Sequence, residues 1–231
     1  MIRLSASVRD TARQLSAGFA GGAALRLINY HSTPRSRAAQ YEAELAALAT
    51  RYRGLDAAGR DRLMAGELPD DPVLIPVLFE GFRDNYDVIL PMIERHGFVA
   101  WFFIPPAFLT VPVAQQRAFA ERQTLIYPQD EYPGERIAMT WEEVRDAHAR
   151  GHLIACHSRT HTELTPETPD AILRDEIVLA KEEFDAGLGA PVDTFCYLRG
   201  AEYGLNPRAD AMLVEAGYRY LFSNFRLQRL P

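Results

Sequence analysis

Short apolar segments alternate with amphipathic ones along most of the chain. The apolar segments are rich in Val, Ile and Phe and apolar on both faces, which is typical of strands buried in a parallel sheet. We assign such strands to residues 24–29, 73–79, 98–104, 153–156, 194–197 and 220–223. Apolar residues at three- and four-residue spacing predict helices over residues 37–52, 84–96, 141–150, 170–188 and 207–216. The alternation predicts an α/β barrel with helices outside a parallel sheet.

Two connections are long for such a fold. They cover residues 54–71 and 105–140, and the second is rich in proline. We interpret each as a lid or an excursion at the rim of the barrel, where substrate selectivity would be determined. Because the chain has no internal repeat or low-complexity linker, we interpret residues 1–231 as one domain with an N-terminal extension over residues 1–22.

Composition and charge disfavour several classes of partner and location. The 231 residues are 48% hydrophobic and carry a net charge of −6, which disfavours nucleic acid as a partner. No apolar window approaches the length of a membrane span, which disfavours a transmembrane helix. The N-terminal segment could still contact a membrane surface. Cys156 and Cys196 form no CxxC pair, and residues 17–25 lack a secretory leader pattern. We therefore expect buried cysteines and a cytoplasmic protein; the oligomeric state stays open.

The sharpest chemical signal is His157 and His161, directly after the strand at residues 153–156. A four-residue spacing places both imidazoles on one side of a helical turn, where they can ligate one divalent metal. Glu80, at the end of another strand, is the natural third ligand. The alternative is a solvated helix start, because such spacings also arise by chance. For His96, His148 and His152 we expect structural or surface roles.

Several segments resemble one known family. Residues 139–144, followed by Gly151 to His161, are similar to the polysaccharide deacetylases, the family-four carbohydrate esterases with a NodB homology domain. Residues 81–86, 195–200 and 216–220 extend the resemblance to about residues 73–223. The resemblance implies a distorted (β/α)7 barrel that hydrolyses N-acetyl groups on sugars. It also implies a divalent metal on Glu80, His157 and His161, with zinc expected and nickel, cobalt or iron as alternatives.

The chain departs from the family in its first motif. The family has T-F-D-D-G, in which the first Asp is the general base and the second binds metal, whereas this chain has Val-Leu-Phe-Glu-Gly at residues 77–81. Phe79 then stands at the base position and cannot accept a proton. Either Glu80 takes the metal-ligand place, or one residue is deleted and Glu80 serves as both ligand and base.

The C-terminal L-x-H motif, which supplies the acid histidine, has no counterpart after the last predicted strand. Residues 27–31 resemble instead the opening Y-H strand of circularly permuted deacetylases. This resemblance implies a permuted barrel with His31 as general acid, the alternative being a hydrogen-bonded histidine at a strand end.

Other polar residues near the strand ends are candidates for substrate contacts. Arg199 suits a carboxylate or phosphate, which indicates an anionic substrate, although an outward ion pair is an equal alternative. Tyr197 and Tyr30 are expected to contact substrate with it. Asp84 is expected to cap the following helix. Two other acids, Glu163 and Glu202, are candidate surrogate bases.

These features favour a metal-dependent deacetylase acting on an N-acetylated sugar or glycan precursor in surface-polysaccharide biosynthesis. In the cytoplasm, that precursor would be nucleotide-linked or lipid-linked. Two alternatives stay open. One is a catalytically degenerate domain that binds a glycan or partner, because Phe79 removes the base. The other is an allantoinase-like amidohydrolase, because that branch of the family also carries glutamates in the first motif.

Overall fold

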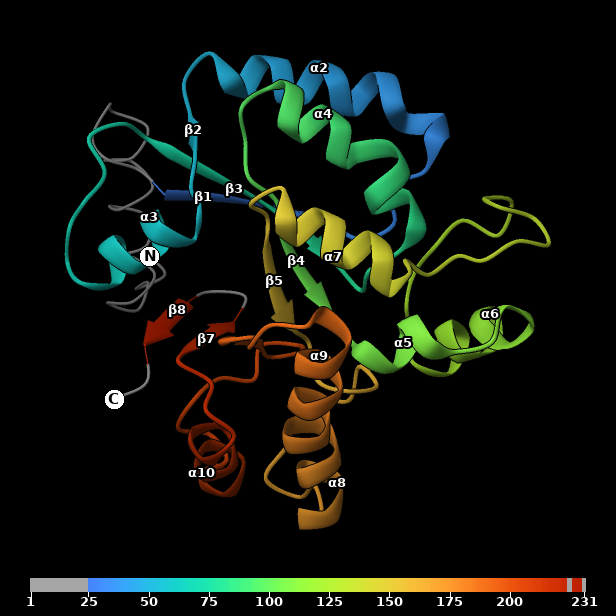
Figure 1. Ribbon diagram of the computed structural model, residues 1–231, viewed down its shortest axis with the longest axis vertical. Coiled ribbons are helices and arrows are strands. Elements are labelled where there is room, and N and C mark those ends of the chain that lie inside the picture. Colours follow the sequence, from blue (N-terminus) through green and yellow to red (C-terminus); the bar gives the residue numbers. More distant parts are fainter. Residues whose placement is uncertain (1–24, 224–225, 230–231) are drawn as a thin grey trace, which may run out of the picture.

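The computed structural model describes residues 25–223 and 226–229, and its centre is an eight-stranded sheet (Figure 1). Neighbouring strands pair in parallel until the last pair, which is antiparallel. The strand order is β1 (Leu25–Tyr30), β3 (Val73–Phe79), β4 (Trp101–Ile104), β5 (Leu153–Cys156), β6 (Thr194–Cys196), β7 (Tyr220–Ser223) and β8 (Arg226–Arg229), with β2 (Arg53–Gly54) paired to β3. The sheet curls into a half-barrel, which confirms the predicted fold class; the circular permutation stays a prediction.

The predicted helices lie on the outer side of the sheet. Figure 1 shows one group along the upper side, α2 (Ala38–Ala49), α4 (Leu90–Arg95) and α7 (Trp141–Ala149). A second group lies along the lower side, α8 (Asp170–Arg174), α9 (Ala180–Leu188) and α10 (Pro207–Glu215). Two of the predicted helices contain a five-residue π-helical segment, η2 (Asn85–Ile89) before α4 and η3 (Asp175–Leu179) between α8 and α9. Periodicity did not predict these two segments, which matter for the site below.

The strands are buried on both faces, as their composition predicted. In β3, Val73, Ile75 and Val77 pack with Trp101 and other residues inside the curled sheet. The alternate positions, such as Leu74, pack outward against the helices. Because side chains of a strand alternate between faces, one continuous apolar run supplies both layers of the core.

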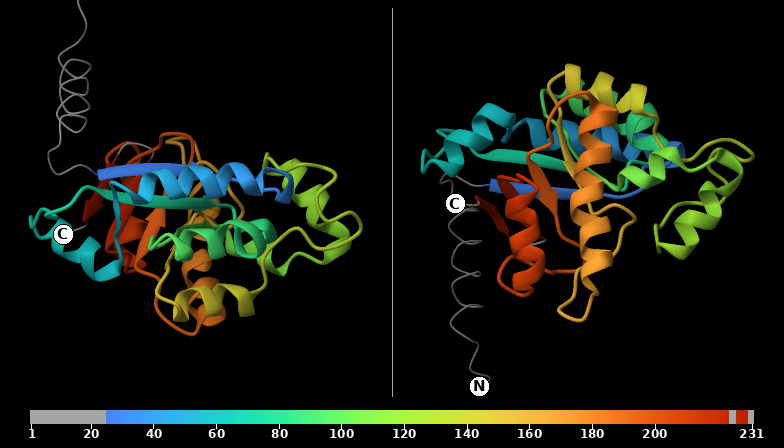
Figure 2. Two further views of the ribbon diagram at one scale, coloured as in Figure 1. Left: turned by 90° about the horizontal axis from the view of Figure 1, so that it is seen from above. Right: turned by 60° about the horizontal axis from the view of Figure 1, so that its bottom comes forward.

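Both long connections have secondary structure of their own. Residues 54–71 contain α3 (Ala57–Met64), and residues 105–140 contain α5 (Pro106–Thr110) and α6 (Val113–Arg122). The second excursion projects beyond one end of the sheet in all three views (Figures 1 and 2). It has a separate apolar cluster in which Phe108, Phe119 and Ile137 pack against Phe82. The excursion is therefore an ordered part of the rim. The short 3-10 helix η1 (Arg35–Arg37) lies between β1 and α2 along the chain.

The helices of the described residues are all too short or too polar to cross a membrane. Residues 1–22, which we interpret as an extension, lie outside the described residues.

Candidate active site

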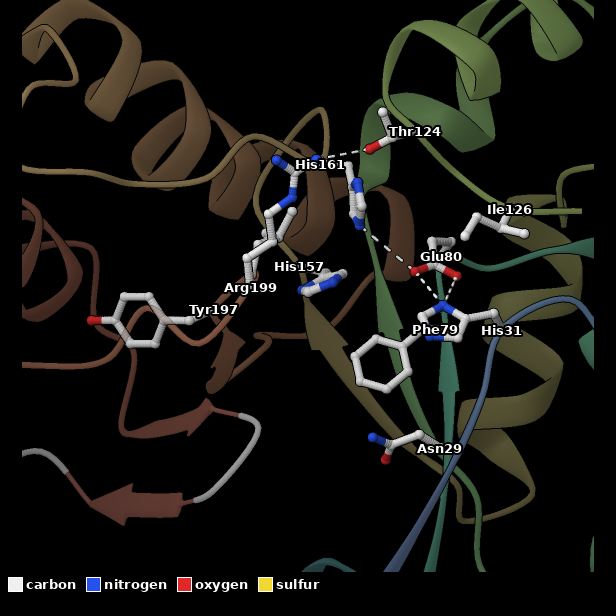
Figure 3. A pocket seen from close by; sticks show the side chains of 11 residues that line it. Asn29, His31, Phe79, Glu80, Thr124, Ile126, His157, His161, Tyr197 and Arg199 are labelled. Atoms are coloured by element: carbon white, nitrogen blue, oxygen red, sulfur yellow. Dashed lines mark hydrogen bonds and ion pairs between the residues drawn. The ribbon is translucent and has the colours of Figure 1, made fainter.

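A pocket of about 630 Å³ opens where several strands end (Figure 3). His31 follows β1, Glu80 follows β3 and His157 follows β5. Because these strands are parallel, their carboxyl ends meet at one edge of the sheet, where barrel active sites gather. The pocket is lined by Asn29, His31, Phe79, Glu80, Thr124, Ile126, His157, His161, Tyr197, Leu198 and Arg199.

Glu80, His157 and His161 meet in this pocket, as the sequence predicted. One ligand-type atom from each residue lies within 4.8 Å of the other two. Glu80 is almost fully buried and adopts a left-handed backbone with φ 66°. Gly81 follows with φ 70°, and a Cβ atom there would lie 2.9 Å from the Ile104 side chain. This left-handed pair ends β3 beside the two histidines, and only glycine fits at its second position.

The tautomers of both histidines are determined by backbone carbonyls. The Nδ1 atom of His157 lies 3.0 Å from the Cys196 carbonyl, and that of His161 lies 2.9 Å from the Gln123 carbonyl. Because a carbonyl only accepts, both Nδ1 atoms carry a proton, which leaves Nε2 of each ring as the nitrogen that can bind a metal. The His161 Nε2 atom lies 3.6 Å from the Glu80 carboxylate. Two such imidazoles and one carboxylate fit a divalent ion such as zinc.

The segment that carries the two histidines is not the helical turn that we expected. Residues 157–161 form an irregular loop, in which Ser158 has φ 55° and His161 has φ 66°. The prediction of a helical turn was therefore wrong, although the two side chains do converge. Their ring centroids lie 5.1 Å apart because the loop turns back at two left-handed residues.

The protonation states of the cluster suit a cation. Burial lowers the pKa of His157 to about 4, and the neighbouring His161 adds to this effect. Burial alone would raise the pKa of Glu80, but the nearby His161 and His31 imidazoles outweigh it, so this pKa lies below its ordinary value. At neutral pH, His157 is therefore neutral and Glu80 ionised, as metal ligands must be.

His31 lies against the same carboxylate. Its Nδ1 atom is 2.9 Å from both oxygens of Glu80, and its ring stacks on Phe79 with centroids 5.1 Å apart. The hydrogen bond with Glu80 is the main cause that raises the pKa of His31. Because the ionised carboxylate accepts, Nδ1 carries the proton and Nε2 is free to accept one. The Asn85 side chain donates to the His31 carbonyl at 2.7 Å and so positions the loop after β1.

Phe79 lies beside the cluster of Glu80, His31 and His157. Its ring contacts those of Phe103 and His157, each with centroids 5.3 Å away. Among the described residues that line the pocket, Glu80 is the only acid. The candidate bases Glu163 and Glu202 do not line it.

The three residues predicted to contact substrate differ in where their polar groups lie. Arg199 stands at the pocket with an exposed side chain, donates to the Thr124 hydroxyl at 3.0 Å and lies 3.8 Å from Glu163. The Tyr197 hydroxyl instead donates to Asp210 at 3.3 Å and points away from the cluster (Figure 3). The Tyr30 hydroxyl donates to Glu44, and Tyr30 does not line the pocket. Arg199 therefore lines the pocket, whereas neither tyrosine hydroxyl faces it, and a substrate contact for Arg199 stays a prediction.

Asp84 does not cap a helix, contrary to our prediction. Its carboxylate accepts from the hydroxyls of Ser32 at 2.5 Å and Thr33 at 3.4 Å, in the loop after His31. Burial raises the pKa of Asp84 to about 6. Asp84 and Asn85 together therefore tie the His31 loop to the start of η2.

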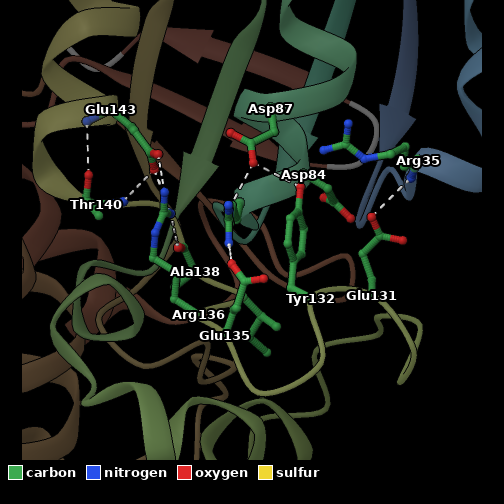
Figure 4. Close-up of polar contacts among 12 residues, drawn as sticks. Arg35, Asp84, Asp87, Glu131, Tyr132, Glu135, Arg136, Ala138, Thr140 and Glu143 are labelled. Atoms are coloured by element: carbon green, nitrogen blue, oxygen red, sulfur yellow. Dashed lines mark hydrogen bonds and ion pairs between the residues drawn. The ribbon is translucent and has the colours of Figure 1, made fainter.

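A polar network anchors the end of the rim excursion beside Asp84 (Figure 4). Arg83 binds Asp87 at 2.9 Å and Glu135 at 2.7 Å, and its guanidinium lies 4.1 Å from the Tyr132 ring centroid. The Tyr132 hydroxyl also donates to Asp87. Arg136 forms a second, bidentate pair with Glu143 in the first turn of α7.

The sequence did not identify every residue that lines the pocket. It did predict the roles of several cysteines and histidines outside the pocket correctly. Thr124 and Ile126 come from the rim excursion, which was expected at the pocket but carries no motif that singles them out. Cys156 and Cys196 are free and buried, as predicted. The expected structural roles of two other histidines are also confirmed, because His152 binds Glu94 and the Ala100 backbone, and His96 binds Glu42.

Comparisons with known proteins agree with this fold. The structure is similar to the Streptococcus pyogenes deacetylase PplD in complex with acetate, with a TM-score of 0.62 and 14% identity over 85% of this chain and 80% of that one. It is also similar to IcaB from Ammonifex degensii, with a TM-score of 0.62 and 13% identity over 87% of this chain and 83% of that one. The BpsB deacetylase domain from Bordetella bronchiseptica has a TM-score of 0.59 and 13% identity over 87% of both chains. No curated protein matches the sequence.

These identities are low, and the structural likeness shows the fold alone. The family assignment comes from the sequence. A family model described as polysaccharide deacetylase matches residues 74–221, well over half of the chain, and this segment includes Glu80, His157 and His161. The chain therefore belongs to the polysaccharide deacetylase family.

Proposed function

We propose that the protein is a metal-dependent hydrolase that removes N-acetyl groups from a sugar or polysaccharide precursor in surface-polysaccharide biosynthesis. Membership of the family supports an acetylated carbohydrate as the substrate. The observation that carries metal dependence is the convergence of Glu80, His157 and His161, with both Nδ1 atoms engaged by carbonyls. A cluster with this donor set is suited to hold zinc, with nickel, cobalt or iron as alternatives.

Glu80, His157 and His161 would hold the ion in this proposal. When bound, a divalent ion supplies Lewis-acid chemistry, which lowers the pKa of a water molecule and polarises an acetyl carbonyl. The carbonyls of Cys196 and Gln123 hold the two imidazoles in the tautomer that presents Nε2. These contacts orient the ligands before the substrate arrives.

His31 is the proton-transfer group in our proposal. Glu80 holds Nδ1 protonated, so Nε2 is the nitrogen that can take a proton from the attacking water. The water oxygen bonds to the acetyl carbon, the C–N bond breaks, and His31 returns the proton to the leaving amine. His31 would thus combine two roles that the family divides between an Asp and a His, because Phe79 stands at the base position.

Arg199 is the group that would select the substrate. Its guanidinium is exposed at the pocket, and its partners are one hydroxyl and a carboxylate 3.8 Å away. A planar guanidinium binds phosphate or carboxylate through parallel hydrogen bonds. We therefore include an anionic group, such as the phosphate of a carrier-linked sugar, in the proposed substrate.

Metal content and acetate release together test the proposal. The purified protein is analysed for bound metals and then incubated with a panel of N-acetylated sugars, oligosaccharides and phosphate-linked precursors. We expect stoichiometric metal and acetate release in the wild type. Glu80→Ala and His161→Ala should lose both and keep the fold, because the site lies at the rim of the half-barrel. Unchanged metal content in His161→Ala would refute the ligand assignment.

Phe79 favours a second candidate, a domain that binds an acetylated glycan without turnover. An aromatic ring at the base position can pack against a sugar ring but cannot activate water. Saturable glycan binding without acetate release, in protein that contains metal, would support this candidate.

A cytoplasmic location is the remaining part of the proposal. Fractionation of cells that produce the full chain would test it, and recovery of the protein outside the cytoplasm would exclude a cytoplasmic precursor as the substrate.

A further inference from the structure

A buried carboxylate lies behind the loop that carries the two histidines. Glu176, the second residue of η3, is 4% exposed, and both of its oxygens face Thr160. One oxygen accepts from the Thr160 backbone N–H at 2.8 Å, and the other accepts from the Thr160 hydroxyl. Burying a carboxylate is unfavourable unless hydrogen bonds compensate it, and both oxygens of Glu176 have such bonds to one residue of the loop.

The core does not need this carboxylate. Leu173, Ile177, Ala180 and Phe184 form the apolar stripe of the α8–η3–α9 rod, and all four are fully buried. Glu176 lies on the flank of this stripe, toward the loop of residues 157–162. π-helical segments such as η3 occur frequently at functional sites. The position of Glu176 is therefore explained by what it binds in the loop.

The loop needs external support because two of its residues have unfavourable backbone conformations. Ser158 and His161 both have positive φ, which costs energy for residues other than glycine and persists only where the surroundings hold it. The loop is also held by a bond from the Ala107 backbone to the Arg159 carbonyl and by the Arg159–Glu183 ion pair. The Thr160 hydroxyl also lies 3.0 Å from the Thr162 hydroxyl within the loop, and Glu176 holds Thr160, next to His161, from outside the loop.

We propose that Glu176 is a positioning residue for the metal ligand His161, holding its backbone while the Gln123 carbonyl holds its ring. The inference rests on the metal centre of the proposed function. Without Glu176, the Thr160 N–H loses its acceptor, and the residue before the left-handed His161 is no longer held to η3. The Nε2 atom of His161 would then no longer be held beside Glu80 and His157. Removing such a supporting contact typically weakens metal affinity about 10- to 100-fold.

The test measures Zn²⁺ and Co²⁺ affinity of the full chain by calorimetric titration, together with the thermal midpoint of the metal-free protein. Glu176→Ala should bind both ions about 10- to 100-fold more weakly. Glu176→Gln keeps an oxygen for the Thr160 N–H and should restore most of the affinity. Glu183→Ala is the matched control, because it removes a carboxylate that reaches the same loop only through the half-buried Arg159 side chain. The metal affinity of this variant should stay near the wild-type value.

The outcomes separate this inference from the proposed function. Wild-type affinity in Glu176→Ala, with a lowered thermal midpoint, would show a purely structural role and overturn the inference alone. A wild-type protein that binds neither ion would overturn the metal centre as well. If Glu176→Ala does not fold, Thr160→Val removes the hydroxyl partner and leaves the backbone bond. We then expect a several-fold loss of affinity with a changed Co²⁺ absorption spectrum, and an unchanged affinity and spectrum would overturn the role.

Discussion

At the scale of single residues, two side chains determine what chemistry the pocket can perform. Phe79 stands where our interpretation of the first motif places the family's general base, and its ring stacks on His31. The two oxygens of Glu80 face His31 on one side, and one of them faces His161 on the other. One buried carboxylate therefore both completes the candidate metal-ligand cluster and orients the neighbouring imidazole.

His31→Asn tests the role of that imidazole. The Asn amide can still donate to Glu80 from about the position of Nδ1, but it has no ring nitrogen that accepts a proton. We expect kcat for acetate release to fall by roughly 10²- to 10⁴-fold, with Zn²⁺ affinity changed by less than about tenfold. Steady-state kinetics and metal titration of the same preparation check this. A variant with the wild-type kcat would exclude His31 as the proton-transfer group.

At the scale of elements, the two π-helical segments support the two loops of the site. The start of η2 binds the loop after β1, through Asp84 to Ser32 and through Asn85 to His31. In the same way, η3 binds the loop after β5 through Glu176. The Asn85 Oδ1 atom is the one buried side-chain polar atom without a hydrogen-bond partner in the described part of the chain. Such a group costs stability, which indicates that Asn85 is present for its bond to the His31 carbonyl.

Asp84 should make stability depend on pH in a specific direction. Burial raises its pKa from 3.8 to about 6, so the folded protein holds this proton more tightly than the unfolded chain. The protonated Asp84 carboxyl group makes its full contribution to the free energy of unfolding below about pH 4. This contribution is lost as pH rises through about 6, which lowers the free energy of unfolding by about 3 kcal/mol. Glu131 is a nearby acid that raises this pKa further, whereas the Ser32 and Thr33 hydroxyls lower it.

Asp84→Asn removes this titration and keeps an oxygen that can accept from Ser32. Urea unfolding at pH 4, 5, 6 and 7 should show the variant gaining stability relative to the wild type as pH rises, by about 2.4 kcal/mol over this range. A constant difference in the free energy of unfolding across this range would mean that Asp84 titrates normally.

At the scale of the whole molecule, the candidate metal centre joins segments far apart in the sequence. Glu80 follows β3, the two histidines follow β5, and the carbonyls that orient them come from the end of β6 and the rim excursion. An ion bound there would link the half-barrel to this excursion. Because such a set of ligands assembles only in the folded state, binding of the ion should stabilise the fold.

Metal-dependent thermal stability tests this linkage. At a free Zn²⁺ concentration about 100 times the Kd, the expected stabilisation is about 2.7 kcal/mol. For a chain of this size, the thermal midpoint should rise by about 5–10 °C, and a chelator should reverse the rise. The control, His161→Ala, should show little shift. An equal shift in this variant would mean that the ion binds elsewhere.

The sequence by itself determined the strands and the three predicted ligands. The observed bounds of β3, β5 and β7 match the predicted ones, because apolar runs of Val, Ile and Phe are a local property of the chain. Glu80 and His157 could be identified because each directly follows such a strand, and parallel strand ends meet at one edge of the sheet. The resemblance to the family singled out His31, whose imidazole lies beside Glu80 in the structure, and its role stays a prediction.

Only the tertiary structure decided how these residues are held. The left-handed loop of His161, the acceptors for its ring and the buried position of Glu176 depend on contacts between segments far apart in the sequence. The same holds for Asp84, which binds the loop after β1 rather than its own helix, and for Tyr197, whose hydroxyl points to Asp210. Periodicity and composition report which face of an element is buried. The direction of a polar side chain depends on partners that are brought near only when the sheet curls and the helices pack on it.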